Sequence, residues 1–261
     1  MPAAKPRSVQ PLNQHFGYVT CSMNRSSIPT PLTVSRRVAI VARWPFGIGL
    51  TSWRYMWRTT PLRRRERGGE DNEHLGPPLP PDTDSDRIQS QADGVGPLYH
   101  RRYRAEIHAS RVRPEELIHR ITVEPNAVAP TDFARFIKVG GEEGAMRVGD
   151  EWLVRMPGPW DGPVRVVDKT PMSFRFATLS GHLEAGQIEF RAYEDSVLAF
   201  EIESWARSGD RLSSVLFNKL RMAKEVQLHM WISVLERIVV LTQGRRAGMI
   251  SVDTRRLDDD G

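Results

Sequence analysis

Cysteine is almost absent from this sequence, since Cys21 is the only one. A lone cysteine excludes an internal disulfide framework and any zinc site built from several cysteines. The seven histidines form no H-E-x-x-H or H-x-x-E-H pattern, and there is no phosphate loop, dinucleotide fingerprint or serine nucleophile elbow. We therefore expect neither a metal site nor a cofactor.

Long hydrophobic runs are also missing. No window reaches the roughly 18 consecutive apolar residues of a membrane-spanning helix. The opening residues, MPAAKPRSVQ, are not followed by the apolar core of a secretory signal. We expect a cytoplasmic protein, with a peripheral position at a membrane as the alternative. Met23 is a second in-frame methionine, and it competes with Met1 as the true start.

Lysine is scarce beside arginine, at 5 against 32, and the net charge is +5. The basic residues of the C-terminal two-thirds are scattered or interleaved with acids, and we find no RNA- or DNA-binding motif. The arginine bias is therefore more typical of a GC-rich genome than of nucleic-acid binding. We expect no nucleic-acid partner.

Hydrophobic residues make up 39% of the chain, and the shortfall lies before residue 98. This uneven distribution divides the chain into five expected parts. They are a disordered N-terminus (1–33), short amphipathic helices rich in aromatic and basic residues (34–58), a Pro/Arg-rich linker (59–93), one folded domain (94–244) and a disordered C-terminal tail (245–261).

The segment Val34–Arg58 has two interpretations. An apolar run, Val38–Ala42, is flanked by arginines and followed by Trp44, Trp53, Tyr55 and Trp57. Such a segment can pack its aromatic side on a domain or partner. It can equally lie in a membrane interface, where basic and aromatic residues surround an apolar core.

The folded part reads mainly as strands. A first strand alternates apolar and polar residues around Tyr99–Ile107, and Pro114 opens a short helix. Short connections then join five further strand patterns, so neighbouring strands should be antiparallel. These patterns are Glu151–Met156, Val164–Asp168, Ser173–Leu179, Gln187–Tyr193 and Val197–Trp205. One face of the resulting sheet is apolar and needs a partner.

That partner is a long amphipathic helix, expected over Asp210–Gln243 without an internal proline or glycine. Asp210 suits the N-cap, and Gly244 suits the left-handed position after the last turn. The apolar stripe comprises Leu212, Leu216, Leu220, Ala223, Met230, Val234, Ile238 and Leu241. Gln227 interrupts this stripe. It satisfies a backbone group, or lies at the edge of the stripe, or lines a cavity and points a polar group at a ligand.

Several motifs in this region resemble the bacterial family known as domain of unknown function 1990. They are VGDEW (148–152), RMPGPWDGPVRVV (155–167), SGHLEAGQI (180–188) and FEIESWAR (200–207), with WRTTP (57–61) and GVGPLY (94–99) before them. The resemblance spans roughly Trp53–Gln243 and carries no established activity. The family is similar to the helix-grip superfamily (START, Bet v 1-like, SRPBCC). This resemblance implies an α+β fold in which a curved antiparallel sheet wraps around a long C-terminal helix and encloses a cavity. A largely disordered N-terminal extension precedes this domain.

Few residues offer catalytic chemistry. His182 with Glu184 could act as a general acid–base pair, or both could be exposed turn residues. Glu201 and Glu203 lie two residues apart on one strand face and could act as paired carboxylates. The alternative is that they form cross-strand ion pairs with arginines such as Arg165, Arg175 or Arg191.

Three functions follow as hypotheses. The first is binding of a hydrophobic small molecule or lipid between sheet and helix, in a cavity lined by Phe174, Phe176, Phe190, Phe200, Gln227 and Trp231. The second is a cyclase- or hydrolase-type enzyme using His182, Glu184 or Glu201. The third is an interaction module tethered to a membrane or partner through residues 34–58. An apolar cavity above about 300 Å³ would favour the first.

Overall fold

The computed structural model describes residues 62–68, 75–131, 134–156, 161–209 and 222–257. The expected disordered N-terminus (1–33) and amphipathic segment (34–58) therefore lie outside the described residues. In chain order the elements are β1 (Leu62–Gly68), the 3-10 helix η2 (Gln91–Asp93), β2 (Val95–His108), α2 (Pro114–Val123), the 3-10 helix η3 (Pro125–Ala127), β3 (Arg135–Gly140), β4 (Glu151–Arg155), β5 (Asp161–Lys169), β6 (Ser173–Thr178), β7 (Glu184–Asp195), β8 (Val197–Ser208), α4 (Met222–Leu241), β9 (Arg245–Arg246) and β10 (Ile250–Leu257).

The strands form one large curved sheet in the order β1-β10-β2-β8-β7-β6-β5-β4-β3, with β9 paired to β2. All neighbours are antiparallel except β1 and β10, which run parallel. The expected antiparallel meander from β4 to β8 is thus confirmed. Short connections made it predictable, because each turn returns the chain beside the strand it has just left.

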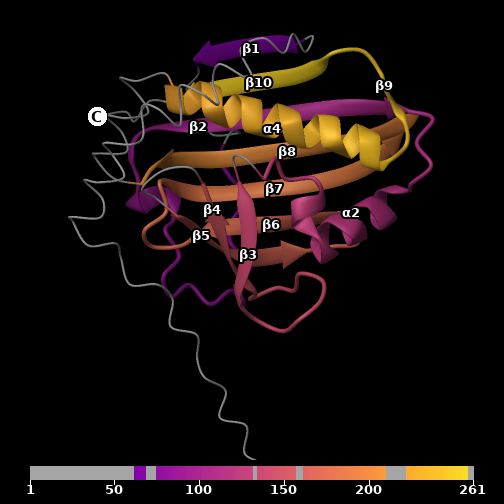
Figure 1. Cartoon of the computed structure of the whole chain (residues 1–261). Helices are drawn as coiled ribbons and strands as arrows, with labels where there is room; N and C mark the ends of the chain where they lie inside the picture. The colour runs from indigo at the N-terminus through magenta and orange to yellow at the C-terminus, as the bar shows by residue number, and fades with distance from the viewer. Residues whose placement is uncertain (1–61, 69–74, 132–133, 157–160, 210–221, 258–261) are drawn as a thin grey trace, which may run out of the picture.

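Both helices lie on the same face of the sheet (Figure 1). The side chains of α2 and α4 join the apolar residues of that face in one core, which includes Leu117, Phe200, Ile202, Leu235 and Ile238. Each of these five side chains is almost completely buried. We call this the inner face, and the opposite one the outer face.

The described part of the C-terminal helix, α4, runs for 20 residues from Met222 to Leu241. The expected start at Asp210 lies outside the described residues. At the other end the expectation about the cap was wrong: Gln243, with φ of 54°, takes the left-handed position that we assigned to Gly244. Gly244 is required for a different reason. A Cβ there would lie 2.4 Å from Cγ2 of Ile107, so the chain passes too close to β2 for a side chain.

The segment after α4 also differs from the expectation of a disordered tail over 245–261. It forms β9 and β10, and β10 pairs with β2 through seven register positions, from Ser251 opposite Arg104 to Leu257 opposite Leu98. Ile250 and Val252 are buried, at 0% and 2% exposed. These two residues alternate with polar ones, as in a strand. The pattern is too short to predict a strand, because charged residues follow it.

The linker expected over 59–93 is also structured where it is described. Residues 62–68 form the edge strand β1, and the segment after residue 75 is tied to the sheet. The backbone N–H of Gln89 donates to Thr178 O at 2.8 Å, Arg165 donates to Asp84 O at 2.6 Å, and Gln187 donates to Pro77 O at 2.9 Å. The proline cluster therefore belongs to a chain packed along the sheet.

Candidate functional site

An apolar cavity lies on the inner face, between the sheet, α2 and α4. Its lining includes five of the six residues that the sequence predicts for a ligand site: Phe174, Phe176, Phe190, Phe200 and Trp231. The aromatic rings contact one another directly. Phe174 stacks on Phe190 with ring centroids 4.8 Å apart, and Phe190 meets Trp231 edge-on at 5.6 Å. The strand alternation brings these rings together from β6, β7, β8 and α4.

The volume of this cavity is about 20 Å³. That is room for about one water molecule, whereas drug-sized ligands occupy sites of several hundred cubic ångströms. The aromatic side chains thus nearly fill the space they enclose. The predicted wall is present, but the expected ligand-sized void is not found at this place.

Trp231 lines the cavity and carries a hydrogen-bond donor without a partner among the described residues. The residue is 8% exposed, and its Nε1 finds no hydrogen-bond partner among the described residues. A buried N–H without an acceptor costs free energy, so such groups are rare in folded proteins. The indole N–H of Trp152 also lacks a partner among the described residues, and that residue is 5% exposed. Trp152 does not line this cavity.

A polar cluster of Arg101, Glu184 and Gln227 joins β2, β7 and α4 on the inner face. Arg101 Nη1 donates to Gln227 Oε1 at 2.9 Å and lies 3.3 Å from Glu184 Oε1. Gln227 Nε2 in turn donates to Glu184 Oε2 at 3.1 Å. The Gln227 side chain thus binds an ion pair and not a backbone group.

Arg101 is the member that the sequence analysis missed. It is only 5% exposed, and its guanidinium lies 4.7 Å from the ring centroid of Tyr99. A buried cation needs a counter-charge, which Glu184 supplies, so the cluster is neutral as a whole. Arg101 and Tyr99 also line a second small cavity, of about 20 Å³, toward Leu228 and Val252.

His182 does not form the acid–base pair predicted with Glu184. Its Nδ1 lies 2.9 Å from the backbone N and 3.0 Å from the carbonyl O of Glu184, while the Glu184 carboxylate points to Arg101. Burial lowers the pKa of His182, although the Glu184 charge opposes the shift. The two side chains therefore face different groups, and His182 is neutral at pH 7.

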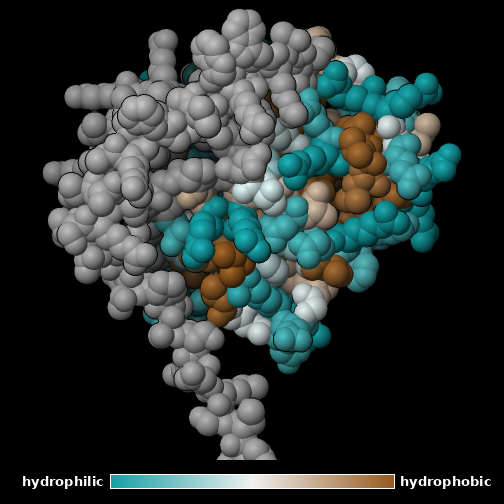
Figure 2. Space-filling view, viewed as in Figure 1, coloured by the Kyte–Doolittle hydropathy of each residue, from teal (hydrophilic) through white to brown (hydrophobic). Residues whose placement is uncertain are grey.

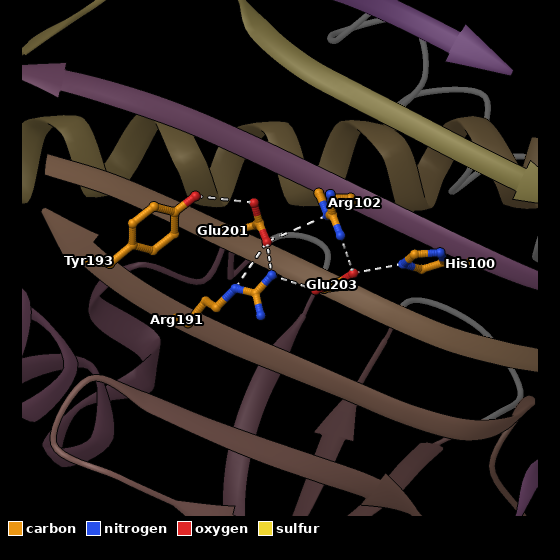
Figure 3. A network of polar contacts seen from close by, with 6 residues as sticks. All are labelled: His100, Arg102, Arg191, Tyr193, Glu201 and Glu203. Atoms are coloured by element: carbon orange, nitrogen blue, oxygen red, sulfur yellow. Dashed lines mark hydrogen bonds and ion pairs between the residues drawn. The ribbon is translucent and has the colours of Figure 1, made fainter. Parts of the chain in front are cut away.

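Glu201 and Glu203 lie on the outer face in a network with four other side chains (Figure 3). Arg191 pairs with both carboxylates, at 2.7 Å to Glu203, and Arg102 donates to Glu203 at 2.8 Å. His100 Nε2 lies 2.7 Å from Glu203, and Tyr193 OH lies 3.5 Å from Glu201. The pairing of both glutamates with Arg191 agrees with the ion-pair interpretation, whereas Arg175 pairs with Asp168 and Arg165 with Glu151.

The network also sets the charge of its carboxylates. Burial alone would raise the pKa of Glu203, but hydrogen bonds from His100 and Arg102 and the charges of Arg102 and Arg191 outweigh it and lower the pKa to about 2. Glu189, which lies opposite Glu203 in the sheet, shows the reverse: burial raises its pKa, against the charges of Arg191 and Arg175. Glu203 is thus permanently charged near neutrality and does not suit a general acid.

Among the residues that the structure describes, no group of three or more His, Cys, Asp and Glu side chains could hold a metal ion. Within the same ranges, no helix is long and apolar enough to cross a membrane.

No known protein-family model matches the chain, and no curated protein matches it. Among solved structures, the chain is similar to major latex-like protein 151 of Panax ginseng, with 17% identity, a TM-score of 0.37, and coverage of 56% of this chain and 98% of that one. Protein Ms6760 of Mycobacterium smegmatis gives 16%, 0.36, 64% and 98%, and Ara h 8.0201 gives 9%, 0.37, 56% and 98%. Membership of the family of unknown function 1990 is not confirmed, and likenesses this weak carry no argument about function.

Proposed function

We propose that this chain binds a small hydrophobic molecule between the sheet and α4. The observation that carries the proposal is Trp231, which lines a cavity walled by aromatic rings and whose buried indole N–H has no acceptor among the described residues. A ligand with an apolar body and one acceptor oxygen would satisfy that donor while it contacts Phe174, Phe176, Phe190 and Phe200.

The small volume of the cavity makes binding depend on movement. At about 20 Å³ the site is closed, so a ligand must separate α4 from the sheet to enter. On the described part of the surface over α4, hydrophobic residues form separate patches among hydrophilic ones (Figure 2). A site between the sheet and α4, opened by movement of α4, therefore suits a hydrophobic molecule better than the solvent-exposed side of α4 does.

Gln227 marks the polar end of the proposed site. It sits on α4 one helical turn before Trp231 and is already held by Arg101 and Glu184. If α4 moves, the Gln227 amide leaves this cluster and presents a donor and an acceptor to the ligand. The proposed ligand is therefore amphiphilic, with its polar group toward Gln227.

The test uses prodan, a neutral hydrophobic dye whose ketone accepts a hydrogen bond and whose emission shifts to the blue in apolar surroundings. We expect the full chain to bind it. Trp231→Phe removes the donor and keeps an aromatic ring, so it should weaken binding about tenfold, the worth of one hydrogen bond. Trp152→Phe is the matched control, because it removes a buried unpaired indole N–H away from the cavity, and it should bind as the parent does.

Native mass spectrometry and lipid extraction of the purified protein complete the test. A co-purifying hydrophobic molecule would identify the ligand class. If nothing co-purifies and prodan does not bind, the proposal is wrong. Equal weakening by the two tryptophan variants would show that prodan reports general loosening of the core.

A further inference from the structure

Arginines gather on the outer face at the β1 edge of the sheet. Residues opposite each other on paired strands share a face, so the register assigns each side chain to one side. Arg65 of β1 lies opposite Asp253 of β10, which lies opposite Arg102 of β2, a member of the outer network. Arg63 and Arg67, two residues to either side of Arg65, therefore point to the outer face as well.

The register adds a fourth arginine, because Arg67 lies opposite Arg255 of β10. We call Arg63, Arg65, Arg67 and Arg255 the basic strip. Arg102 and Arg104 of β2 border it on the same face. The strip is about 7 Å from one side chain to the next along β1 and about 5 Å across to β10.

The arginines of the basic strip differ from those of the Glu201 and Glu203 network in their ion pairing. In the network, Arg191 and Arg102 are paired with Glu201 and Glu203. In the strip, Arg63, Arg65 and Arg67 are exposed, and they form no ion pair with any other residue of the described ranges. Asp253 is the one carboxylate among the β1 and β10 residues that face this side. The strip therefore carries a net positive charge that the residues described by the structure do not neutralise.

We propose that the basic strip docks this chain on an anionic phospholipid surface. Complementary charge is the first argument: arginines near an anionic leaflet each contribute about fivefold to binding. The row is the second, since β1 is an edge strand (Figure 1) and residues two apart along a strand point to the same face. This proposal does not depend on ligand binding at the inner face.

A lipid surface fits this strip better than a nucleic acid. Single-stranded nucleic acid sites place aromatic side chains for base stacking beside their basic residues. The strip has none, and the nearest outer-face aromatic pair, His100 and Trp205, stack on each other with centroids 5.5 Å apart.

The experiment is co-sedimentation of the full chain with phosphatidylcholine vesicles that contain or lack phosphatidylserine. We expect binding only to the anionic vesicles, and a loss of binding as salt is raised. The triple variant Arg63→Ser/Arg65→Ser/Arg67→Ser should bind about 100-fold more weakly. The control Arg111→Ser/Arg113→Ser/Arg155→Ser has the same net charge but changes exposed arginines away from the strip, and it should bind like the parent.

Further variants keep the proposal open to refutation. Arg63→Lys/Arg65→Lys/Arg67→Lys retains the charge and should retain most of the binding. Equal losses in the strip and control variants would overturn the proposal, because net charge alone would then explain binding. Tighter binding of the parent to single-stranded or duplex DNA than to anionic vesicles, lost in the strip variant, would overturn it in favour of a nucleic-acid partner. Prodan binding should be unchanged in the strip variant, which separates this proposal from the inner-face site.

Discussion

The two faces of β8 are equally buried but held by different chemistry. Phe200 and Ile202 of the inner face are both 0% exposed, and Glu201 and Glu203 of the outer face are both 3% exposed. The inner residues pack against aromatic rings and α4, whereas the outer ones are covered by arginines that neutralise them. One strand thus stabilises the fold through dispersion and desolvation on one side and through paired charges on the other.

The difference bears on where a ligand can be accepted. Apolar contacts are non-directional, so inner side chains can part and repack around a hydrophobic molecule. The charge pairs of the outer face have fixed partners and lose them if the strands shift. The unpaired Trp231 donor lies on the face that can adapt, which is why we place the ligand there.

Phe200→Ala should have the largest effect on stability. It removes a fully buried ring from the centre of the inner face and leaves a void, which should cost about 3–5 kcal/mol of the free energy of unfolding. Urea denaturation followed by tryptophan fluorescence measures it. A loss below about 1 kcal/mol would mean that the inner face is not the main source of stability.

Glu203→Gln tests the outer face with an intermediate effect. The amide cannot balance Arg102 and Arg191, so we expect a loss of about 2 kcal/mol at pH 7, below that of a fully enclosed pair because both arginines are partly exposed. Glu189→Gln is the matched control, since the pKa of that carboxyl is raised by burial and its charge is unfavourable in the fold. It should leave stability unchanged or increase it.

The pH dependence of the same pair sharpens this comparison. Since the folded pKa of Glu203 is depressed to about 2, its contribution is present above its unfolded pKa, about 4.3, and is lost as the pH falls toward 2. The stability difference between the parent and Glu203→Gln should therefore be constant from pH 7 to about pH 5 and shrink below it. A difference that persists unchanged at pH 2 would show that the charge of Glu203 is not what stabilises the outer face.

Gln227→Met should have the smallest effect. It removes the hydrogen bonds to Arg101 and Glu184 but keeps the volume and leaves the ion pair in place, so we expect a loss of about 1 kcal/mol. Urea denaturation again measures it. A loss as large as that of Phe200→Ala would contradict the view that the inner face is stabilised mainly by apolar packing.

The sequence predicted what its alternation encodes. The meander and the shared face of Phe174, Phe176, Phe190 and Phe200 follow from period-two patterns in β6, β7 and β8, whereas Trp231 lies outside the stripe expected for the helix. Arg101 was also marked by this pattern, since it shares its strand face with Tyr99 and Tyr103, but a charged residue on an apolar face is easily taken for an exception. Its role emerged only when the register placed Glu184 and Gln227 beside it.

The strand at the edge of the sheet, β1, could not be predicted from alternation of apolar and polar residues. β1 reads Leu62-Arg63-Arg64-Arg65-Glu66-Arg67-Gly68 and has no apolar alternation, so its strand conformation depends on pairing with β10, almost two hundred residues later. The volume of the cavity could not be predicted from the sequence either. Periodicity identifies which rings meet, but how closely they fill the space between them depends on rotamers and strand curvature.

The central claim is that the inner face binds a hydrophobic molecule at Trp231, and an NMR titration tests it most directly. The indole N–H signals of Trp231 and Trp152 are assigned in the full chain from the two tryptophan-to-phenylalanine variants, and prodan is added to saturation. We predict that the Trp231 signal moves downfield as its proton gains an acceptor, while the Trp152 signal stays in place. A Trp231 signal that does not move at saturating prodan would contradict the claim.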